Sequence, residues 1–106
     1  MNYLRLKKQA DFQKLFTKGR RAFSPSLTMI YFPSKETRMG ISVGKRHGKS
    51  VKRNRIKRLL REAFRAEREE MNGNWSVVLV PKVRDEYDLN TFKSCLLYTS
   101  PSPRDS

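Results

Sequence analysis

The sequence has very few of the residues on which disulfides and metal sites are built. Cys95 is the only cysteine and His47 the only histidine among 106 residues. A single cysteine excludes an internal disulfide and a cysteine-based metal cluster. A single histidine lacks the partner that a metal-free ribonuclease would use as its general acid or base. These absences argue against a disulfide-stabilised protein and against an enzyme that relies on a pair of histidines.

Long hydrophobic runs and acidic residues are also scarce. No window approaches the roughly 20 apolar residues of a membrane span, and no signal peptide is evident, so we expect a cytoplasmic protein without a membrane partner. Only 10 acidic residues face 24 Lys and Arg, for a net charge of +14. No acid lies within residues 45–61, where carboxylates would have to hold Mg²⁺ for phosphodiester hydrolysis. The excess of positive charge predicts a polyanionic partner.

Apolar spacing and turn residues predict six elements. In order, they are a helix at 9–18, strands at 26–32 and 38–43, a helix at 51–71, a strand at 75–81 and a helix starting at 85–88. The polar residues 34–37 predict a hairpin turn between the first two strands. The continuous apolar run of the third strand predicts a buried, central position. The order α-β-β-α-β-α predicts an α+β protein.

The end of the chain differs in character from the rest. Two prolines among serines cannot continue a helix. The amino-acid sequence of this segment also resembles translated adapter sequence. We therefore expect one domain over residues 1–96 and a non-native or disordered tail over 97–106.

The helix predicted at 51–71 separates apolar from basic side chains. Its apolar stripe comprises Ile56, Leu59, Leu60 and Ala63. The opposite face carries Asn54, Lys57, Arg58 and Arg61. A stripe of mixed charges is usually a solvated surface, but this one has a single sign up to Glu62, which favours contact with phosphates. Arginine offers a planar fork of donors to phosphate oxygens, and asparagine adds a donor and an acceptor.

Two runs of residues carry a resemblance to a known family. They are Gly40-Ile41-Ser42-Val43-Gly44-Lys45-Arg46 and Val51-Lys52-Arg53-Asn54-Arg55-Ile56-Lys57-Arg58-Leu59-Leu60-Arg61-Glu62-Ala63-Phe64. They resemble the protein subunit of bacterial ribonuclease P, whose signature is an Arg-Asn-Arg motif in a basic helix. The resemblance covers roughly Leu6 to Phe92. It implies an α/β sandwich with a small central sheet and a left-handed crossover, although general rules favour the right-handed sense.

The resemblance also implies two RNA-binding surfaces. The surface for the catalytic RNA comprises Lys45, Arg46, Lys52, Arg53, Asn54, Arg55, Lys57, Arg58 and Arg61. A separate cleft for the 5′ leader of precursor tRNA comprises Phe12, Phe16 and Tyr31. Exposed aromatic rings bind single-stranded RNA by stacking on its bases. Phe12 and Phe16 lie one helical turn apart, however, and core packing is the commoner role of such a pair.

The resemblance implies a protein that assists endonucleolytic removal of the 5′ leader from precursor tRNA, with the cleavage itself performed by the RNA subunit. The partners are ribonuclease P RNA and precursor tRNA, with no obligate protein partner. Mg²⁺ is held mainly by the RNA subunit and the substrate, and the protein contributes neither a catalytic residue nor a metal ligand. His47 lies in a glycine-flanked basic loop and is expected at the surface or against RNA. The alternative is a non-enzymatic, ribosomal-type RNA-binding protein or RNA chaperone, which composition alone does not distinguish.

Overall fold

The computed structural model describes residues 3–24, 26–68, 73–83 and 87–99. Its elements are β1 (Leu4–Arg5), α1 (Gln9–Lys18), β2 (Arg20–Phe23), β3 (Leu27–Pro33), β4 (Arg38–Ile41), the short 3₁₀ helix η1 (Lys45–His47), α2 (Ser50–Arg68), β5 (Trp75–Pro81) and α3 (Leu89–Thr99). All six predicted elements are present. The sequence did not predict β1 and β2, which are short and carry charged residues.

The strands form one mixed sheet in the order β1-β4-β5-β3-β2. The central position predicted for β5 is confirmed: it pairs in parallel with β4 and antiparallel with β3. The parallel β4–α2–β5 connection is the predicted crossover, and its left-handed sense stays a prediction. The predicted hairpin between β3 and β4 is wrong, because β5 lies between these two strands. The strands that pair as chain neighbours are β2 and β3.

The position of β5 follows from its side chains, which are apolar on both faces. Val77 and Leu79 are buried on one face of the sheet and Val78 on the other. A strand with apolar side chains on both faces exposes least apolar surface to water when a strand lies at each of its edges and helices cover both faces of the sheet. The charged strand β2 instead occupies an edge, where lysine and arginine discourage pairing with other chains.

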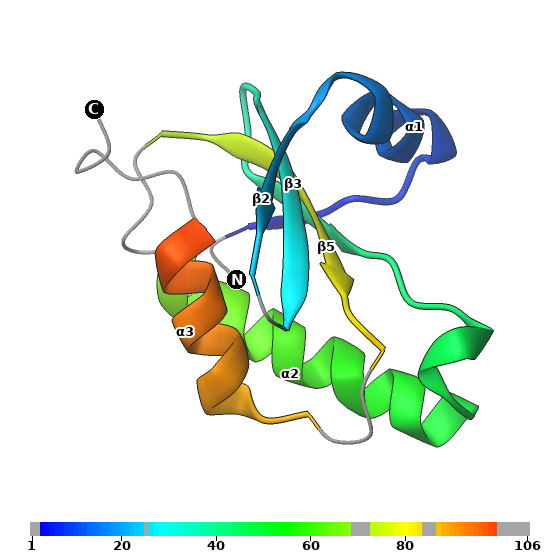
Figure 1. Cartoon of the computed structure of the whole chain (residues 1–106). Helices are drawn as coiled ribbons and strands as arrows, with labels where there is room; N and C mark the ends of the chain where they lie inside the picture. Colours follow the sequence, from blue (N-terminus) through cyan, green and yellow to red (C-terminus); the bar gives the residue numbers. More distant parts are fainter. Residues whose placement is uncertain (1–2, 25, 69–72, 84–86, 100–106) are drawn as a thin grey trace.

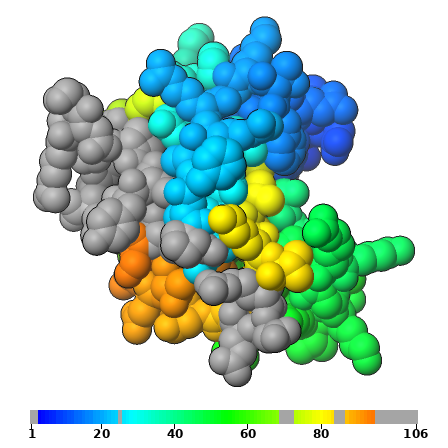
Figure 2. All heavy atoms as spheres, viewed as in Figure 1, coloured from blue at the N-terminus to red at the C-terminus, as the bar shows by residue number. Residues whose placement is uncertain are grey.

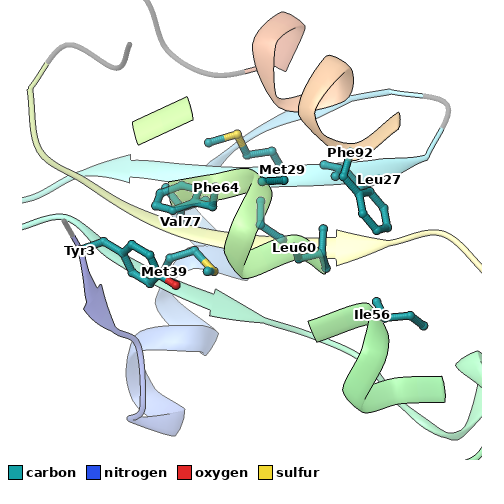
Figure 3. Packing of buried hydrophobic residues seen from close by; sticks show 11 residues of the cluster. Tyr3, Leu27, Met29, Met39, Ile56, Leu60, Phe64, Val77 and Phe92 are labelled. Carbon is teal, nitrogen blue, oxygen red and sulfur yellow. The ribbon is translucent and has the colours of Figure 1, made fainter. Parts of the chain in front are cut away.

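Helices cover the two faces of the sheet unequally, as Figure 1 shows. On one face, the α2–α3 face, the strand residues Leu27, Met29, Val77 and Leu79 pack against Ile56, Leu60, Phe64 and Phe92 of the two helices. Figure 3 shows Phe64 among these side chains; its ring meets that of Tyr3 edge-on at 5.1 Å between centroids. On the other face, the α1 face, Ile30 and Val78 pack with Leu6 and Leu15. The larger core therefore anchors α2.

Two helices have bounds in the structure that differ from the predicted ones. The helix predicted to reach residue 71 is described as Ser50–Arg68, and residues 69–72 lie outside the described part. The last helix starts at Leu89, where Asp88 accepts a hydrogen bond from the backbone nitrogen of Asn90 at 3.4 Å. It continues to Thr99, and residues 100–106 lie outside the described part, so the boundary expected after residue 96 stays a prediction.

Candidate RNA interface

The outer face of α2 presents a row of cations to solvent. Burial of Ile56, Leu60, Ala63 and Phe64 against the sheet turns the opposite side of the helix outward. Within α2, the exposed residues of the expected RNA surface are Asn54, Arg55, Arg58 and Arg61, and Lys57 is half-buried beside them. Ion pairs in the described part of the chain join Arg38 to Asp11 and Glu36, and neither involves Arg55, Lys57, Arg58 or Arg61. The nearest carboxylate on the helix is that of Glu62, which lines a pocket together with Arg58 and Arg61.

Two members of the expected surface point toward the flanks of the helix. The ammonium of Lys52 lies 5.7 Å from the centre of the Tyr87 ring, which precedes α3. Arg53 is half-buried and donates from its Nη2 atom to the Ser50 hydroxyl at 3.2 Å. Its Nε atom is buried without a hydrogen-bond partner among the described residues. Lys52 and Arg53 therefore contribute charge near the start of α2. The guanidinium groups exposed on the outer face of the helix are those of Arg55, Arg58 and Arg61.

His47 ties the basic loop before α2 to the central strand. Its Nδ1 atom accepts a hydrogen bond from the backbone nitrogen of Gly44 at 3.1 Å, and Nε2 lies 2.7 Å from the carbonyl oxygen of Pro81. This pairing requires a neutral ring with its proton on Nε2. Lys45 and Arg46 are exposed on the loop that the ring holds. His47 thus positions the basic loop, and both of its ring nitrogens are already bonded within the protein.

A pocket of about 340 Å³ opens at the edge of the sheet between β4, α1 and α2. Lys57 and Arg61 line it from α2, Arg5 from β1 and Phe12 from α1. The pocket lies where β4 extends beyond its pairing with β1, since that pairing ends at Met39. A cation-lined pocket with an aromatic wall suits an anion attached to a planar ring, as in a nucleotide. It also connects the outer face of α2 with the aromatic side of α1.

Tyr3 lies between this pocket and a second one of about 320 Å³ on the outer side of α2. Burial raises the pKa of Tyr3 above its ordinary value of 10.0, although the positive charges of Arg61, Arg65 and Arg5 act in the opposite direction. The tyrosine is therefore neutral at physiological pH. Tyr3 adds no negative charge to either pocket, and the carboxylate that lines the second pocket is that of Glu62.

The structure brings only two of the three expected leader-binding aromatics together. Phe12 is half-buried on α1 and packs over Gly40, whereas Phe16, one turn later, is 38% exposed. Tyr31 instead points to the α2–α3 face, where its ring meets that of Trp75 edge-on at 5.6 Å. Phe12 packs with the cluster under α1 and Tyr31 with the cluster under α2 and α3, so the two rings lie on opposite sides of the sheet.

The aromatic residue of β3 that does share a face with Phe12 is Phe32. It packs with Ile30 and Val78 under α1, and the ammonium of Lys14 lies 5.4 Å from the centre of its ring. Sequence reasoning missed this residue. Alternation along β3 could have identified it, since Ile30 and Phe32 are two residues apart and α1 covers the face they share.

Gly40 is the residue that allows Phe12 to lie against the sheet. A Cβ atom at Gly40 would come within 2.6 Å of Cζ of Phe12. We expect Gly40→Ala to displace the ring and to lower the free energy of unfolding by about 1–3 kcal/mol, measured by urea denaturation. Gly44→Ala is the matched control, because nothing lies within 4 Å of its Cβ position. Equal stability of the two variants would show that the Phe12 contact does not hold the ring in place.

The described residues include no group of three or more His, Cys, Asp or Glu side chains that could hold a metal ion. Among the same residues, no helix is both long and apolar enough to cross a membrane.

Comparison with known proteins agrees with this geometry. The Ribonuclease P family model matches residues 1–98. The ribonuclease P protein component of Caldanaerobacter subterraneus is 36% identical over 95 residues, covering 87% of this chain and 82% of that protein. That of Clostridium kluyveri is 39% identical over 92 residues, covering 84% and 72%.

Solved structures give the same result. The ribonuclease P protein of Staphylococcus aureus matches with a TM-score of 0.78 at 26% identity, covering 90% of each chain. The ribonuclease P protein of Thermotoga maritima matches with a TM-score of 0.78 at 26% identity, covering 89% of this chain and 92% of that one. The expected α+β fold, the basic helix and these matches agree, and the chain belongs to the ribonuclease P protein family.

Proposed function

We propose that this chain is the protein subunit of ribonuclease P, which binds the catalytic RNA and the 5′ leader of precursor tRNA and assists removal of that leader. The observation that carries the proposal is the outer face of α2, where Arg55, Arg58 and Arg61 are exposed without a carboxylate partner among the described residues. The large apolar core beneath α2 fixes these side chains on a rigid helix. A rigid row of guanidinium groups suits a folded RNA backbone.

The protein acts by lowering the electrostatic cost of bringing two polyanions together. Catalytic RNA and precursor tRNA repel each other, and a protein with a net charge of +14 reduces that repulsion when it lies between them. In this proposal Lys45 and Arg46, held by His47, extend the catalytic-RNA surface beyond the start of α2. The association with ribonuclease P RNA follows from the family.

The leader is proposed to bind on the α1 face of the sheet. Phe12, Phe16 and Phe32 lie on this side, partly exposed, with Lys14 beside the Phe32 ring. Stacking of unpaired bases on these rings would hold the leader whatever its sequence. Tyr31 is not part of this proposed surface, because it packs on the α2–α3 face.

Cleavage itself is assigned to the RNA. Mg²⁺ is proposed to be held mainly by the RNA subunit and the substrate, which supply the oxygen ligands that this ion prefers. The protein contributes positioning and charge neutralisation. The proposed compartment is the cytoplasm.

Reconstitution tests the function. The full chain is added to a bacterial ribonuclease P RNA at low Mg²⁺ concentration, and leader removal is measured. We expect the protein to stimulate cleavage and to bind precursor tRNA more tightly than mature tRNA in the complex, because only the precursor carries a leader. Absence of stimulation by the folded protein would favour the alternative, a non-enzymatic ribosomal-type RNA-binding protein or RNA chaperone.

A further inference from the structure

Phe23 is an aromatic residue whose side chain is not packed in the core. It lies at the end of the edge strand β2 and is 71% exposed, more than any other large aromatic residue in the described part of the chain. Burying a phenylalanine side chain stabilises a protein, and this ring contributes almost none of that stabilisation. A single exposed apolar residue is common on protein surfaces, so its exposure alone carries no inference.

The pairing of Phe23 within the sheet shows from which face its ring projects. In the β2–β3 pair, Phe23 lies directly opposite Thr28, and Thr28 in turn lies opposite Val80 of β5. Directly paired residues project from the same face of a sheet. Val80 packs with the cluster under α1, so Phe23 projects from the α1 face, the side that carries Phe12, Phe16 and Phe32.

The same strand links Phe23 to the aromatic side of α1. Arg21 lies opposite Ile30 and therefore also projects from the α1 face. Its Nη2 atom donates a hydrogen bond to the carbonyl oxygen of Phe16 at 2.8 Å, which joins β2 to the end of α1. Figure 2 shows α1 and β2, in blue and light blue, as one continuous surface. Lys18 at the end of α1 is exposed, as is Arg21, so both add cations at this junction, whereas Arg20 pairs with Tyr31 and projects from the α2–α3 face.

We propose that Phe23 is a stacking platform for a base of single-stranded RNA, and that it extends the leader-binding surface across the α1 face to the β2 edge. An exposed ring on a positively charged sheet face combines the two features that bind single-stranded RNA, namely a stacking surface and cations for the phosphates. The inference rests on the proposed function, since the RNA in question is the precursor leader.

Phe23 and Phe32 serve different nucleotides. Their positions on the β3 ladder, Thr28 and Phe32, are four residues apart, which corresponds to about 13 Å at the rise of a strand. A base stacks in direct contact with a ring, so one base does not contact two rings that are about 13 Å apart. Phe23 therefore binds a part of the leader that lies further along the chain than the part at Phe12, Phe16 and Phe32. Only a leader long enough to reach the β2 edge will contact it.

The test compares a precursor tRNA with a long leader, the same precursor with its leader shortened from the 5′ end, and mature tRNA. Each is bound to the complex of the protein with ribonuclease P RNA. We expect Phe23→Ala and Phe23→Leu to weaken binding of the long-leader precursor by about 5- to 100-fold, and Phe23→Trp to retain it. Affinity for the shortened precursor and for mature tRNA is expected to be unchanged.

Leu4→Ala is the matched control, because Leu4 is an apolar residue that is 50% exposed on β1, at the opposite edge of the same sheet. It is expected to leave all three affinities unchanged. Retention of binding by Phe23→Leu would overturn the stacking assignment. A changed sedimentation of Phe23→Ala, with unchanged leader affinity, would make a second copy of the chain the partner and would also overturn it.

Failure of the inference is separable from failure of the proposed function. If the wild-type complex binds precursor and mature tRNA equally, the proposed leader-binding function is wrong. If the wild-type complex prefers the long leader and all Phe23 variants do so equally, the function stands and the inference is wrong.

Discussion

Charge reversal of both Arg58 and Arg61 to glutamate is expected to weaken binding of the catalytic RNA by roughly 100-fold or more. Both side chains are exposed on the outer face of α2 and pair with no carboxylate among the described residues. A hydrogen bond that involves a charged group contributes about 1.5–3 kcal/mol, and two lost contacts correspond to at least about two orders of magnitude. The glutamates would in addition repel the phosphates.

Salt dependence provides the second measurement for this variant. Each phosphate contact adds about 0.7–0.9 to the slope of log affinity against log salt concentration. Loss of two contacts should therefore reduce the magnitude of the slope by about 1.4–1.8. Affinities are measured over a salt series by filter binding or fluorescence anisotropy.

The matched control changes the same number of charges elsewhere. Lys7 and Lys35 are both exposed and neither lies on α2, so Lys7→Glu with Lys35→Glu lowers the net charge equally. We expect this control to retain most of the affinity. An equal loss in both double variants would mean that net charge alone drives binding, and the outer face of α2 would then not be a docking surface.

Phe64→Ala is expected to cost about 3–5 kcal/mol of the free energy of unfolding, a large share of the roughly 5–15 kcal/mol available to a small domain. Phe64 is fully buried and packs edge-on against Tyr3, in the same core as Leu60 and Phe92. Truncation to alanine leaves a cavity between α2 and the sheet that neighbouring side chains fill only in part. Urea denaturation followed by circular dichroism measures the loss.

Phe16→Ala is the control for this variant, because it removes the same atoms from a ring that is 38% exposed. We expect it to change the free energy of unfolding by less than about 1 kcal/mol and to weaken binding of precursor tRNA far more than of mature tRNA. A stability loss as large as that of Phe64→Ala would show that Phe16 belongs to the core and not to an RNA-binding surface.

The helices were well predicted, because the information that specifies them is local. The bounds predicted for the first helix, residues 9–18, match α1. The division of α2 into a buried stripe around Ile56 and Leu60 and an outer face around Asn54 and Arg58 follows from a period of 3.6 residues, which can be counted in the sequence. The packing of α2 on the sheet does not disturb this pattern.

The strands were predicted less well, because pairing joins distant parts of the chain. The turn at residues 34–37 predicted a β3–β4 hairpin, yet β5 inserts between these strands from some 40 residues later. Edge strands have weaker sequence signals, and the charged segment Arg20–Phe23 was not predicted as a strand at all. Nothing in the local sequence distinguishes these alternatives.

The sequence also did not determine the face of the sheet on which each aromatic side chain lies. Tyr31 and Phe32 are adjacent, and a shift of one residue along β3 decides which of them faces α1. The family resemblance implied Tyr31 as a partner of Phe12, whereas in the structure Phe32 is the β3 aromatic residue that shares a face with Phe12. Phe23 drew no attention in the sequence, because the face to which it belongs is defined only through its pairing with Thr28.

The sequence by itself determined the positive charge, the amphipathic helix with its Arg53-Asn54-Arg55 motif, and the family to which they point. These properties depend on composition and on residues within a few turns of one another. Only the tertiary structure decided the strand order, the face on which each aromatic side chain lies, and the pocket between α1, β4 and α2. These depend on pairings between distant segments, and their register is selected by burial of the whole core rather than by any local pattern.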